Sequence, residues 1–212
     1  MNGYEALINS LIEKGYLKSP EIVAAMRSAD RAAFIPEEYK FAAYDDTPIE
    51  IGFNQVSSQP LTMAFMMELL SPKKGDRILD VGTGSGWQAA MIAYVVGDSG
   101  KVVTIERIPE LHEFAVKSIS EVSLPGIIEP ILGDASLRDT VNGMVFDKII
   151  STAEAEEVPQ AWKDILTVGG RMVIPIGGSL VVADKIAADS FKTREFLGFG
   201  FTPLISGKTR KE

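Results

Sequence analysis

Cysteine is absent from the 212 residues of the chain, and histidine occurs only once, at His112. Without cysteine the protein can form no disulfide, no thiolate metal site and no thiol nucleophile, and we expect no metal centre. Basic side chains are also fewer than acidic ones: the chain has 21 lysines and arginines and 29 aspartates and glutamates. The resulting net charge of −8 argues against a broad nucleic-acid footprint.

Long apolar runs are missing as well. No segment approaches 18 unbroken apolar residues, so we expect no membrane span and no membrane partner. The N-terminal segment carries Glu5 and Glu13 among its apolar residues and lacks the basic and apolar regions of a signal peptide. A cytoplasmic protein is therefore expected, and the length suits a single domain over residues 1–212.

One stretch combines a strand signal with a glycine-rich turn. Residues 77–81 form an apolar run that predicts a buried strand, and residues 86–96 predict a helix. Gly82, Gly84 and Gly86 lie at alternate positions between the two. A strand that turns on glycines into a helix presents bare backbone N–H groups and the positive end of the helix dipole to a ligand. The stretch therefore predicts a ligand-binding turn.

Asp80 and Trp87 indicate which ligand this turn binds. A carboxylate is unfavourable beside a pyrophosphate, but it suits a ligand with a positive centre and hydroxyl groups. Trp87 also occupies the position where a dinucleotide-binding fingerprint has its third glycine. We therefore interpret the turn as a site for S-adenosylmethionine, and we rank an NAD-dependent oxidoreductase last among the alternatives.

Strand and helix signals alternate after residue 76. We expect strands at 77–81, 101–106, 127–132, 145–151 and 170–175, helices at 86–96, 109–122 and 158–166, and a turn or helix near 136–142. Two further strands, 180–187 and 194–205, have no room for a crossover helix and predict an antiparallel hairpin. The expected fold class is α/β, a doubly wound, mostly parallel sheet with antiparallel C-terminal strands.

The N-terminal part differs from this core. Residues 1–75 predict helices at 4–14, 20–29 and 61–70, separated by a long irregular segment over 34–59. A segment of this length without regular structure is typical of a lid over a pocket. We thus divide the domain into N-terminal helices and substrate lid (1–75), a cofactor-binding core (76–205) and a polar tail (206–212).

Polar or small residues follow four of the predicted parallel strands. Asp80, Glu106, Asp134 and Thr152 each stand at a strand's carboxyl end, the edge where ligands bind in open α/β sheets. Glu106 suits the two ribose hydroxyls, and Asp134, with small neighbours such as Ala135, suits an adenine amino group. The alternatives remain that Glu106 is a surface acid and that Asp134 only builds a turn.

The segment from Phe53 to Pro60 holds two adjacent serines. Ser57 or Ser58 could cap the helix that follows. Alternatively, one hydroxyl faces the cofactor's sulfonium and orients an acceptor carboxylate.

Together these motifs resemble those of the protein-L-isoaspartate (D-aspartate) O-methyltransferase family. The resemblance covers about residues 4–205 and is carried by 31–36, 44–46, 48–52, 58–60, 80–90, 103–110 and 169–177. It implies a class I methyltransferase, Rossmann-like fold and S-adenosylmethionine as cofactor. It also implies methyl transfer to the free carboxylate of L-isoaspartyl or D-aspartyl residues in damaged proteins and peptides, which initiates their repair.

The resemblance assigns roles to individual positions. Ser58 matches the family's active-site serine. The expected cofactor-binding residues are Asp80, Gly82, Thr83, Gly84, Ser85, Gly86, Glu106, Arg107, Asp134, Ala135 and Thr152. The expected substrate-binding residues are Val56, Ser57, Ser58 and Gln59.

The chain departs from the family's pattern at two places. Val56 and Ser57 stand where a threonine and a larger apolar residue are common, and residues 154–157 include three acids. Those acids would repel an isoaspartyl carboxylate if they lined the substrate's entrance. Two alternatives therefore stay open: a divergent methyltransferase acting on a small molecule or another protein group, and a non-catalytic module that kept the fold. The oligomeric state is not predicted.

Overall fold

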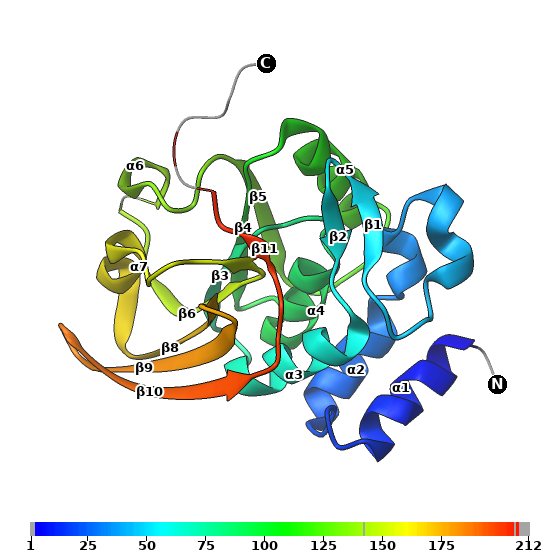
Figure 1. The fold of residues 1–212 in the computed structure, drawn as a ribbon, viewed down its shortest axis with the longest axis horizontal. Helices are drawn as coiled ribbons and strands as arrows, with labels where there is room; N and C mark the ends of the chain where they lie inside the picture. Colours follow the sequence, from blue (N-terminus) through cyan, green and yellow to red (C-terminus); the bar gives the residue numbers. More distant parts are fainter. Residues whose placement is uncertain (1–2, 142, 206, 208–212) are drawn as a thin grey trace.

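The centre of the protein is a sheet of largely apolar strands. We describe it from a computed structural model, which places residues 3–141, 143–205 and 207. The strands of this sheet are β3 (Arg77–Val81), β4 (Lys101–Glu106), β5 (Ile127–Leu132), β6 (Phe146–Ser151), β8 (Leu166–Ile176), β9 (Ser179–Ala187) and β10 (Ser190–Leu197). Their order is β10-β9-β8-β6-β3-β4-β5 (Figure 1). The first five in sequence pair in parallel, whereas β9 and β10 pair antiparallel, as predicted.

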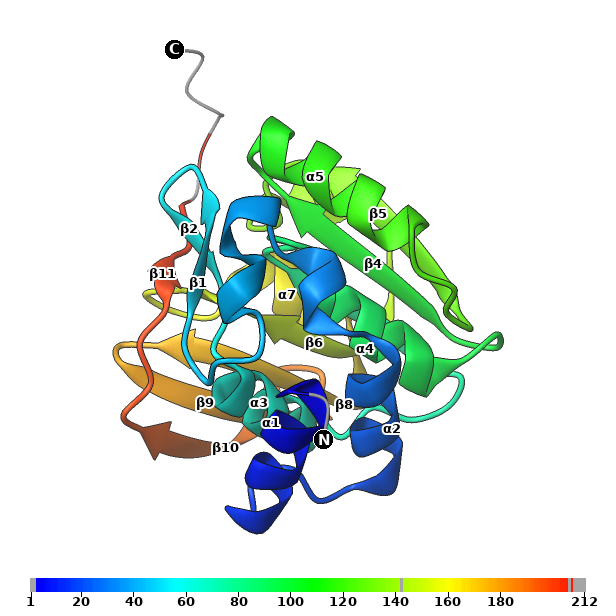
Figure 2. The same cartoon turned by 90° about the vertical axis from the view of Figure 1, so that its right-hand side faces the viewer.

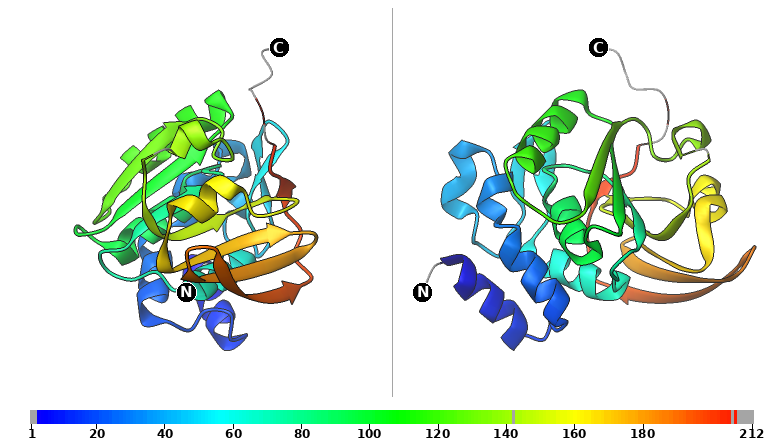
Figure 3. Two further views of the ribbon diagram at one scale, coloured as in Figure 1. Left: turned by 90° about the vertical axis from the view of Figure 1, so that its left-hand side faces the viewer. Right: turned by 180° about the vertical axis from the view of Figure 1, so that it is seen from behind.

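Helices cover both faces of this sheet, as Figure 3 shows. They are α1 (Gly3–Glu13), α2 (Pro20–Ser28), α3 (Pro60–Leu70), α4 (Trp87–Val96), α5 (Pro109–Ser120), α6 (Arg138–Val141) and α7 (Gln160–Ile165). Alternate strand residues point to opposite faces. Ile78 and Val102 belong to the apolar cluster that includes α1 to α4, whereas Leu79 and Val103 pack with α6 and α7.

The N-terminal helices share the core of the sheet. Their buried residues form one apolar cluster with α4 and with one face of β3, β4, β6, β8 and β9. The Trp87 indole Nε1 donates a hydrogen bond of 2.8 Å to the carbonyl oxygen of Ala29, which lies just after α2. None of the helices among residues 3–141 and 143–205 has the length and apolar character needed to cross a membrane.

The segment 34–59 has more regular structure than predicted. It contains the end of a 3₁₀ helix, η1 (Arg31–Phe34), a second one, η2 (Glu37–Ala42), and a hairpin of β1 (Ile49–Gly52) and β2 (Gln55–Ser57). Positive φ angles at Gly52, Phe53 and Asn54 form the turn of the hairpin. The sequence did not predict these short strands, because hydrogen bonds from Arg31 to backbone carbonyl oxygens hold the segment in place.

The junction between α7 and β8 also differs from the prediction. The strand expected at 170–175 begins at Leu166, directly after the helix, and runs to Ile176. Gly169 has a φ of +89°, and the pairing between β6 and β8 shifts register near Phe146. Gly169 and Gly170 therefore lie at an irregularity within a longer strand than predicted.

The bounds predicted for the last strand of the sheet, 194–205, are wrong. β10 ends at Leu197, and Gly198, with a φ of +93°, starts a turn away from the sheet. The chain then forms β11 (Thr202–Pro203), which pairs in parallel with β7 (Ala153–Glu154). Figure 2 shows β11 beside the β1–β2 hairpin. The predicted polar tail 206–212 lies outside the described residues, except for Gly207.

Candidate active site

A cavity of about 800 Å³ lies at the carboxyl edge of the parallel strands. It is lined by most of the predicted site residues, namely Val56, Ser57, Ser58, Gln59, Gly82, Thr83, Gly84, Ser85, Glu106, Arg107, Asp134, Ala135 and Thr152. Asp80 and Gly86 are not part of the lining. The structure thus brings three of the four predicted strand-end residues to one cavity and places the fourth behind it.

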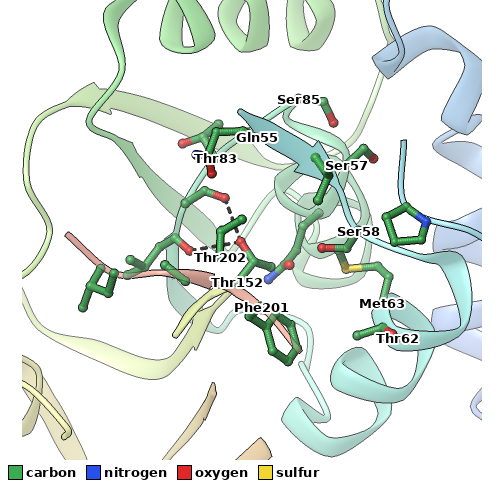
Figure 4. A pocket seen from close by; sticks show the side chains of 18 of the residues that line it. Gln55, Ser57, Ser58, Thr62, Met63, Thr83, Ser85, Thr152, Phe201 and Thr202 are labelled. Atoms are coloured by element: carbon green, nitrogen blue, oxygen red, sulfur yellow. Dashed lines mark hydrogen bonds between the residues drawn. The ribbon is translucent and has the colours of Figure 1, made fainter. Parts of the chain in front are cut away.

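The glycine turn forms one wall of the cavity. Gly82 and Gly84 have φ angles of +86° and +54°, which only glycine adopts readily. A Cβ on Gly82 would lie 2.9 Å from Thr152 Oγ1, and one on Gly84 would lie 3.4 Å from Ile51 Cδ1. Thr152 Oγ1 donates hydrogen bonds to the carbonyl oxygens of Gly82 and Val81, at 3.1 and 3.5 Å (Figure 4). The turn is therefore held against neighbours on both sides.

Glu106, at the end of β4, connects the glycine turn to α5. Its Oε2 accepts from the Gly84 N–H at 3.0 Å. Its Oε1 accepts from the N–H groups of Arg107 and Ile108 at 2.9 and 3.0 Å. A carboxylate has about four acceptor positions, so the three bonds leave capacity for a ligand donor. Glu106 is thus a cavity-lining acceptor whose position is fixed by the backbone on either side.

Asp134, after β5, is a second acceptor on the same edge. Its Oδ1 accepts from the N–H and the hydroxyl of Ser136, at 2.9 and 2.6 Å. Its Oδ2 accepts from the Gly207 N–H at 2.8 Å. The neighbouring Ala135 is small and buried, and its carbonyl oxygen accepts from the Trp162 indole at 2.8 Å. Asp134 thus builds the predicted turn and also lines the cavity.

Asp80 belongs to β3 and is fully buried. Its Oδ2 accepts from the Thr104 hydroxyl at 2.7 Å, and Thr104 Oγ1 lies 2.7 Å from the hydroxyl of Thr83. Its Oδ1 has no hydrogen-bond partner among the described residues. Burial raises the pKa of Asp80 from 3.8 to about 7; the Thr104 hydrogen bond lowers it, and the charge of Glu106 raises it further. Asp80 therefore reaches the cavity only through two threonine hydroxyls.

Ser58 is half-buried and lines the cavity from the opposite side. Figure 4 shows it beside Met63. No hydrogen bond engages its hydroxyl within the described part of the chain, so the group is available to a ligand. Gln59 differs, because its Nε2 donates to the Asp46 carbonyl oxygen at 2.9 Å. The same wall contains Val56, which is 42% exposed, and the buried Ser57.

A single buried guanidinium holds this wall in place. Arg31 is fully buried and donates to the carbonyl oxygens of Ala43, Asp45, Thr47, Ser57 and Ser58, at 3.0 to 3.3 Å. The guanidinium also lies 5.2 Å from the centre of the Trp87 ring. Burial lowers the pKa of Arg31 to about 10, which keeps it charged at neutral pH. These bonds explain why a segment without a sequence period is ordered.

The three acids of residues 154–157 do not line the cavity. Glu154 Oε1 accepts from the Gly178 N–H at 2.8 Å, and Glu156 and Glu157 are exposed. Their charges are therefore screened by solvent and directed outside the site. Because they lie outside the cavity lining, these acids give no reason to expect repulsion of an acidic substrate.

Several lining residues were not predicted. They include Tyr16, Thr62, Met63, Gln88 and the segment 197–205. The segment was missed because its apolar residues indicated a continuous strand. Gln88 was missed because it follows the glycine turn inside a helix, although a polar residue in an otherwise apolar helix was a usable signal.

The strand order, the glycine turn after β3 and the acceptors after β4 and β5 define the class I methyltransferases, which bind their cofactor at this edge. The chain belongs, more specifically, to the protein-L-isoaspartate(D-aspartate) O-methyltransferase family, whose sequence model matches residues 2–209.

Individual relatives support this membership. A protein-L-isoaspartate O-methyltransferase of Ignicoccus hospitalis is 40% identical over 94% of this chain and 95% of its own. One of Methanopyrus kandleri is 36% identical, over 95% and 90% of the two chains. A Plasmodium falciparum protein assigned to the same activity, crystallised with S-adenosyl-L-homocysteine, is 24% identical and shares the fold, with a TM-score of 0.84 over 97% and 99% of the two chains.

Proposed function

We propose that this protein transfers the methyl group of S-adenosylmethionine to the free carboxylate of L-isoaspartyl or D-aspartyl residues in damaged proteins and peptides, and thereby initiates their repair. One observation carries the proposal. The acceptors suited to a nucleoside, Glu106 and Asp134, and an unengaged hydroxyl, Ser58, line the same cavity. Membership of the family agrees with this assignment.

The cavity suits the cofactor in size and in the chemistry of its lining. Its volume lies within the range of ordinary small-molecule sites. Glu106 retains acceptor capacity for a ribose hydroxyl. Asp134 and the small Ala135 suit an adenine ring. S-adenosylmethionine, when bound, supplies an electrophilic methyl group on a sulfonium.

The contribution of the protein's own residues to the reaction is to position the two reactants. A carboxyl group with a pKa of about 3.9 is ionised at neutral pH, so the nucleophile needs no strong base. The role we give to Ser58 is to donate a hydrogen bond to one oxygen of that carboxylate and to orient the other oxygen. Residues of the hairpin and the segment 197–205 also line the cavity, and the role we give them is to exclude water. Holding the two reactants in line in a partly dry site provides most of the acceleration.

A pair of peptides tests the proposal directly. One contains a single L-isoaspartyl residue, and the other contains a normal aspartyl residue in the same sequence. We expect S-adenosylmethionine-dependent methylation of the first only, measured as methyl ester formed. Equal methylation of both peptides, or of neither, contradicts the proposed substrate.

Two further statements belong to this proposal. We place the protein in the cytoplasm and expect no nucleic-acid partner. The net charge of −8 supports the second statement, because a nucleic acid would be repelled at long range.

A further inference from the structure

The part of the cavity that lies next to α3 and β10 is apolar. The lining residues of this part, here called the aromatic end, are Tyr16, Leu61, Leu197, Phe199 and Phe201. Leu197 is 81% exposed. One exposed leucine is ordinary, but an exposed leucine that borders aromatic rings inside a cavity indicates a binding surface.

Phe65 of α3 holds the aromatic end together from behind, because it is not itself part of the lining. Its ring stacks on Phe199, with the ring centres 5.3 Å apart and an angle of 8° between the planes. Its other contacts are edge-to-face, with Phe196 of β10 at 5.3 Å and with Tyr16 at 6.0 Å. Such pairs stabilise aromatic clusters beyond the burial of their surface. The rings of the aromatic end are therefore in place before a ligand binds.

The aromatic end adjoins Ser58 and is separate from the acceptors suited to a nucleoside. Glu106 and Asp134 follow β4 and β5, and the strand order places β5 and β10 at opposite edges of the sheet. Leu197 is the last residue of β10. Leu61 belongs to the first turn of α3, which begins directly after Gln59 and packs on β6 and β8. A substrate held at Ser58 therefore extends toward the aromatic end.

The charges of the lining restrict what the aromatic end can bind. Among the described residues that line the cavity, the charged ones are Glu106, Arg107 and Asp134, which follow β4 and β5. A charged side chain placed at the aromatic end would lose its hydration without gaining a partner. An apolar side chain would instead gain the free energy of burial. The aromatic end therefore suits an apolar side chain of the substrate.

We propose that the aromatic end binds the side chain of the residue that precedes the isoaspartyl residue, and that it makes the protein prefer a large apolar residue there. This inference rests on the proposed function, in which Ser58 orients the isoaspartyl carboxylate. In an L-isoaspartyl residue the free carboxylate is attached to Cα, and the preceding residue is joined to the same Cα through the amide nitrogen. The following residue is joined through the side-chain carbons and lies further from the carboxylate.

Three isoaspartyl peptides that differ only at the preceding position test the inference on the wild-type protein. They carry leucine, serine or glutamate there, and methyl ester formation gives kcat/KM for each. We expect kcat/KM to be about tenfold higher for the leucine peptide than for the serine peptide, as expected for burying about half of a leucine side chain. The glutamate peptide should have the lowest value.

Leu197→Ser tests the surface itself. The ratio of kcat/KM between the leucine and serine peptides should fall to about threefold or less, because the variant removes apolar area from the aromatic end. The dissociation constant of S-adenosyl-L-homocysteine, measured by calorimetry, should change less than about twofold, because Glu106 and Asp134 lie at the other end of the cavity. Ile186→Ser is the matched control, since Ile186 is a 60% exposed residue of β9 outside the lining. It should leave the ratio at the wild-type value.

Three results overturn the inference. They are equal kcat/KM of the wild type for the leucine and serine peptides, a ratio that Leu197→Ser leaves unchanged or that Ile186→Ser lowers equally, and a tenfold weaker binding of S-adenosyl-L-homocysteine to Leu197→Ser. The last result would assign the aromatic end to the cofactor. A wild type that methylates none of the three peptides would refute the proposed function itself, so the two failures are distinguishable.

Discussion

The glycine turn and the β1–β2 hairpin both line the cavity, and Ile51 of the hairpin packs near Gly84. Different interactions hold the two regions. The turn depends on backbone conformation and on bonds between neighbouring strand ends, such as Glu106 to Gly84. The hairpin side depends on one buried arginine that reaches five carbonyl oxygens over residues 43–58. The glycine-turn side of the cavity, where we propose that the cofactor binds, is thus held by local interactions. The hairpin side, where we propose that the substrate binds, is held by a single residue, Arg31, that is distant in the sequence.

The largest effect should follow from removing that arginine. Arg31→Ala leaves several buried carbonyl oxygens without a donor, and we expect the free energy of unfolding to fall by about 5 kcal/mol. Denaturant unfolding measures this loss. Arg31→Lys should give an intermediate value, because an ammonium has three donors and lacks the planar geometry of the guanidinium. Arg27→Ala is the matched control, because Arg27 forms an exposed pair with Glu5; equal losses for Arg27→Ala and Arg31→Ala would contradict the comparison.

The buried carboxyl of Asp80, next to the glycine turn, makes the stability of the protein depend on pH. Its pKa is about 7 in the folded state and near 3.8 when exposed, so the folded state binds more protons between these values. Stability must therefore fall as the pH rises from about 4 to about 7. Asp80→Asn should remove this slope and make the variant more stable than the wild type at pH 8, on the order of 3 kcal/mol.

Unfolding measured from pH 4.5 to 8 without ligand tests this expectation. The two proteins should have similar stability at the acid end, which serves as the internal control. Parallel curves at all pH values would show that Asp80 is not the source of the slope.

Ser58→Ala should lower methylation without changing the affinity for the cofactor product. Loss of one hydrogen bond to a carboxylate corresponds to about 2 kcal/mol, so methylation of an isoaspartyl peptide should fall roughly 30-fold. The dissociation constant of S-adenosyl-L-homocysteine should stay nearly unchanged. Full activity of this variant would refute the role given to Ser58.

Glu106→Ala should have the opposite effect. We expect S-adenosyl-L-homocysteine to bind roughly tenfold more weakly, because a ribose hydroxyl loses its acceptor. Calorimetry measures this change, and an unchanged dissociation constant would refute the ribose assignment. Thermal unfolding of the variant serves as a control for the backbone bonds that Glu106 also accepts.

The smallest effect should come from the acids outside the cavity. Replacing Glu154, Glu156 and Glu157 together with glutamine should change the KM for an isoaspartyl peptide by less than about twofold, because solvent and salt screen their charges. Peptide kinetics at low and high ionic strength measure this. A large fall in KM at low salt would mean that these acids do repel the substrate.

The same contrast explains what could be predicted from the sequence. Glu106, Asp134 and Thr152 were predicted because strand ends of a parallel sheet meet at one edge, and a local motif marks each of them. The hairpin could not be predicted, since Arg31 orders it through backbone carbonyls, which carry no sequence signal. The prediction for the segment 197–205 was wrong for a related reason: its apolar residues line the cavity instead of continuing β10.

The pairing of β11 with β7 has a consequence for biosynthesis. Every strand of the central sheet precedes residue 198, but one side of the cavity is supplied by residues 197–205. A nascent chain can therefore assemble its whole sheet before the binding chamber is closed. A chain truncated just after β10 would keep every strand of the central sheet but lack the residues that line this side of the chamber, so the stretch after β10 completes the chamber and not the sheet.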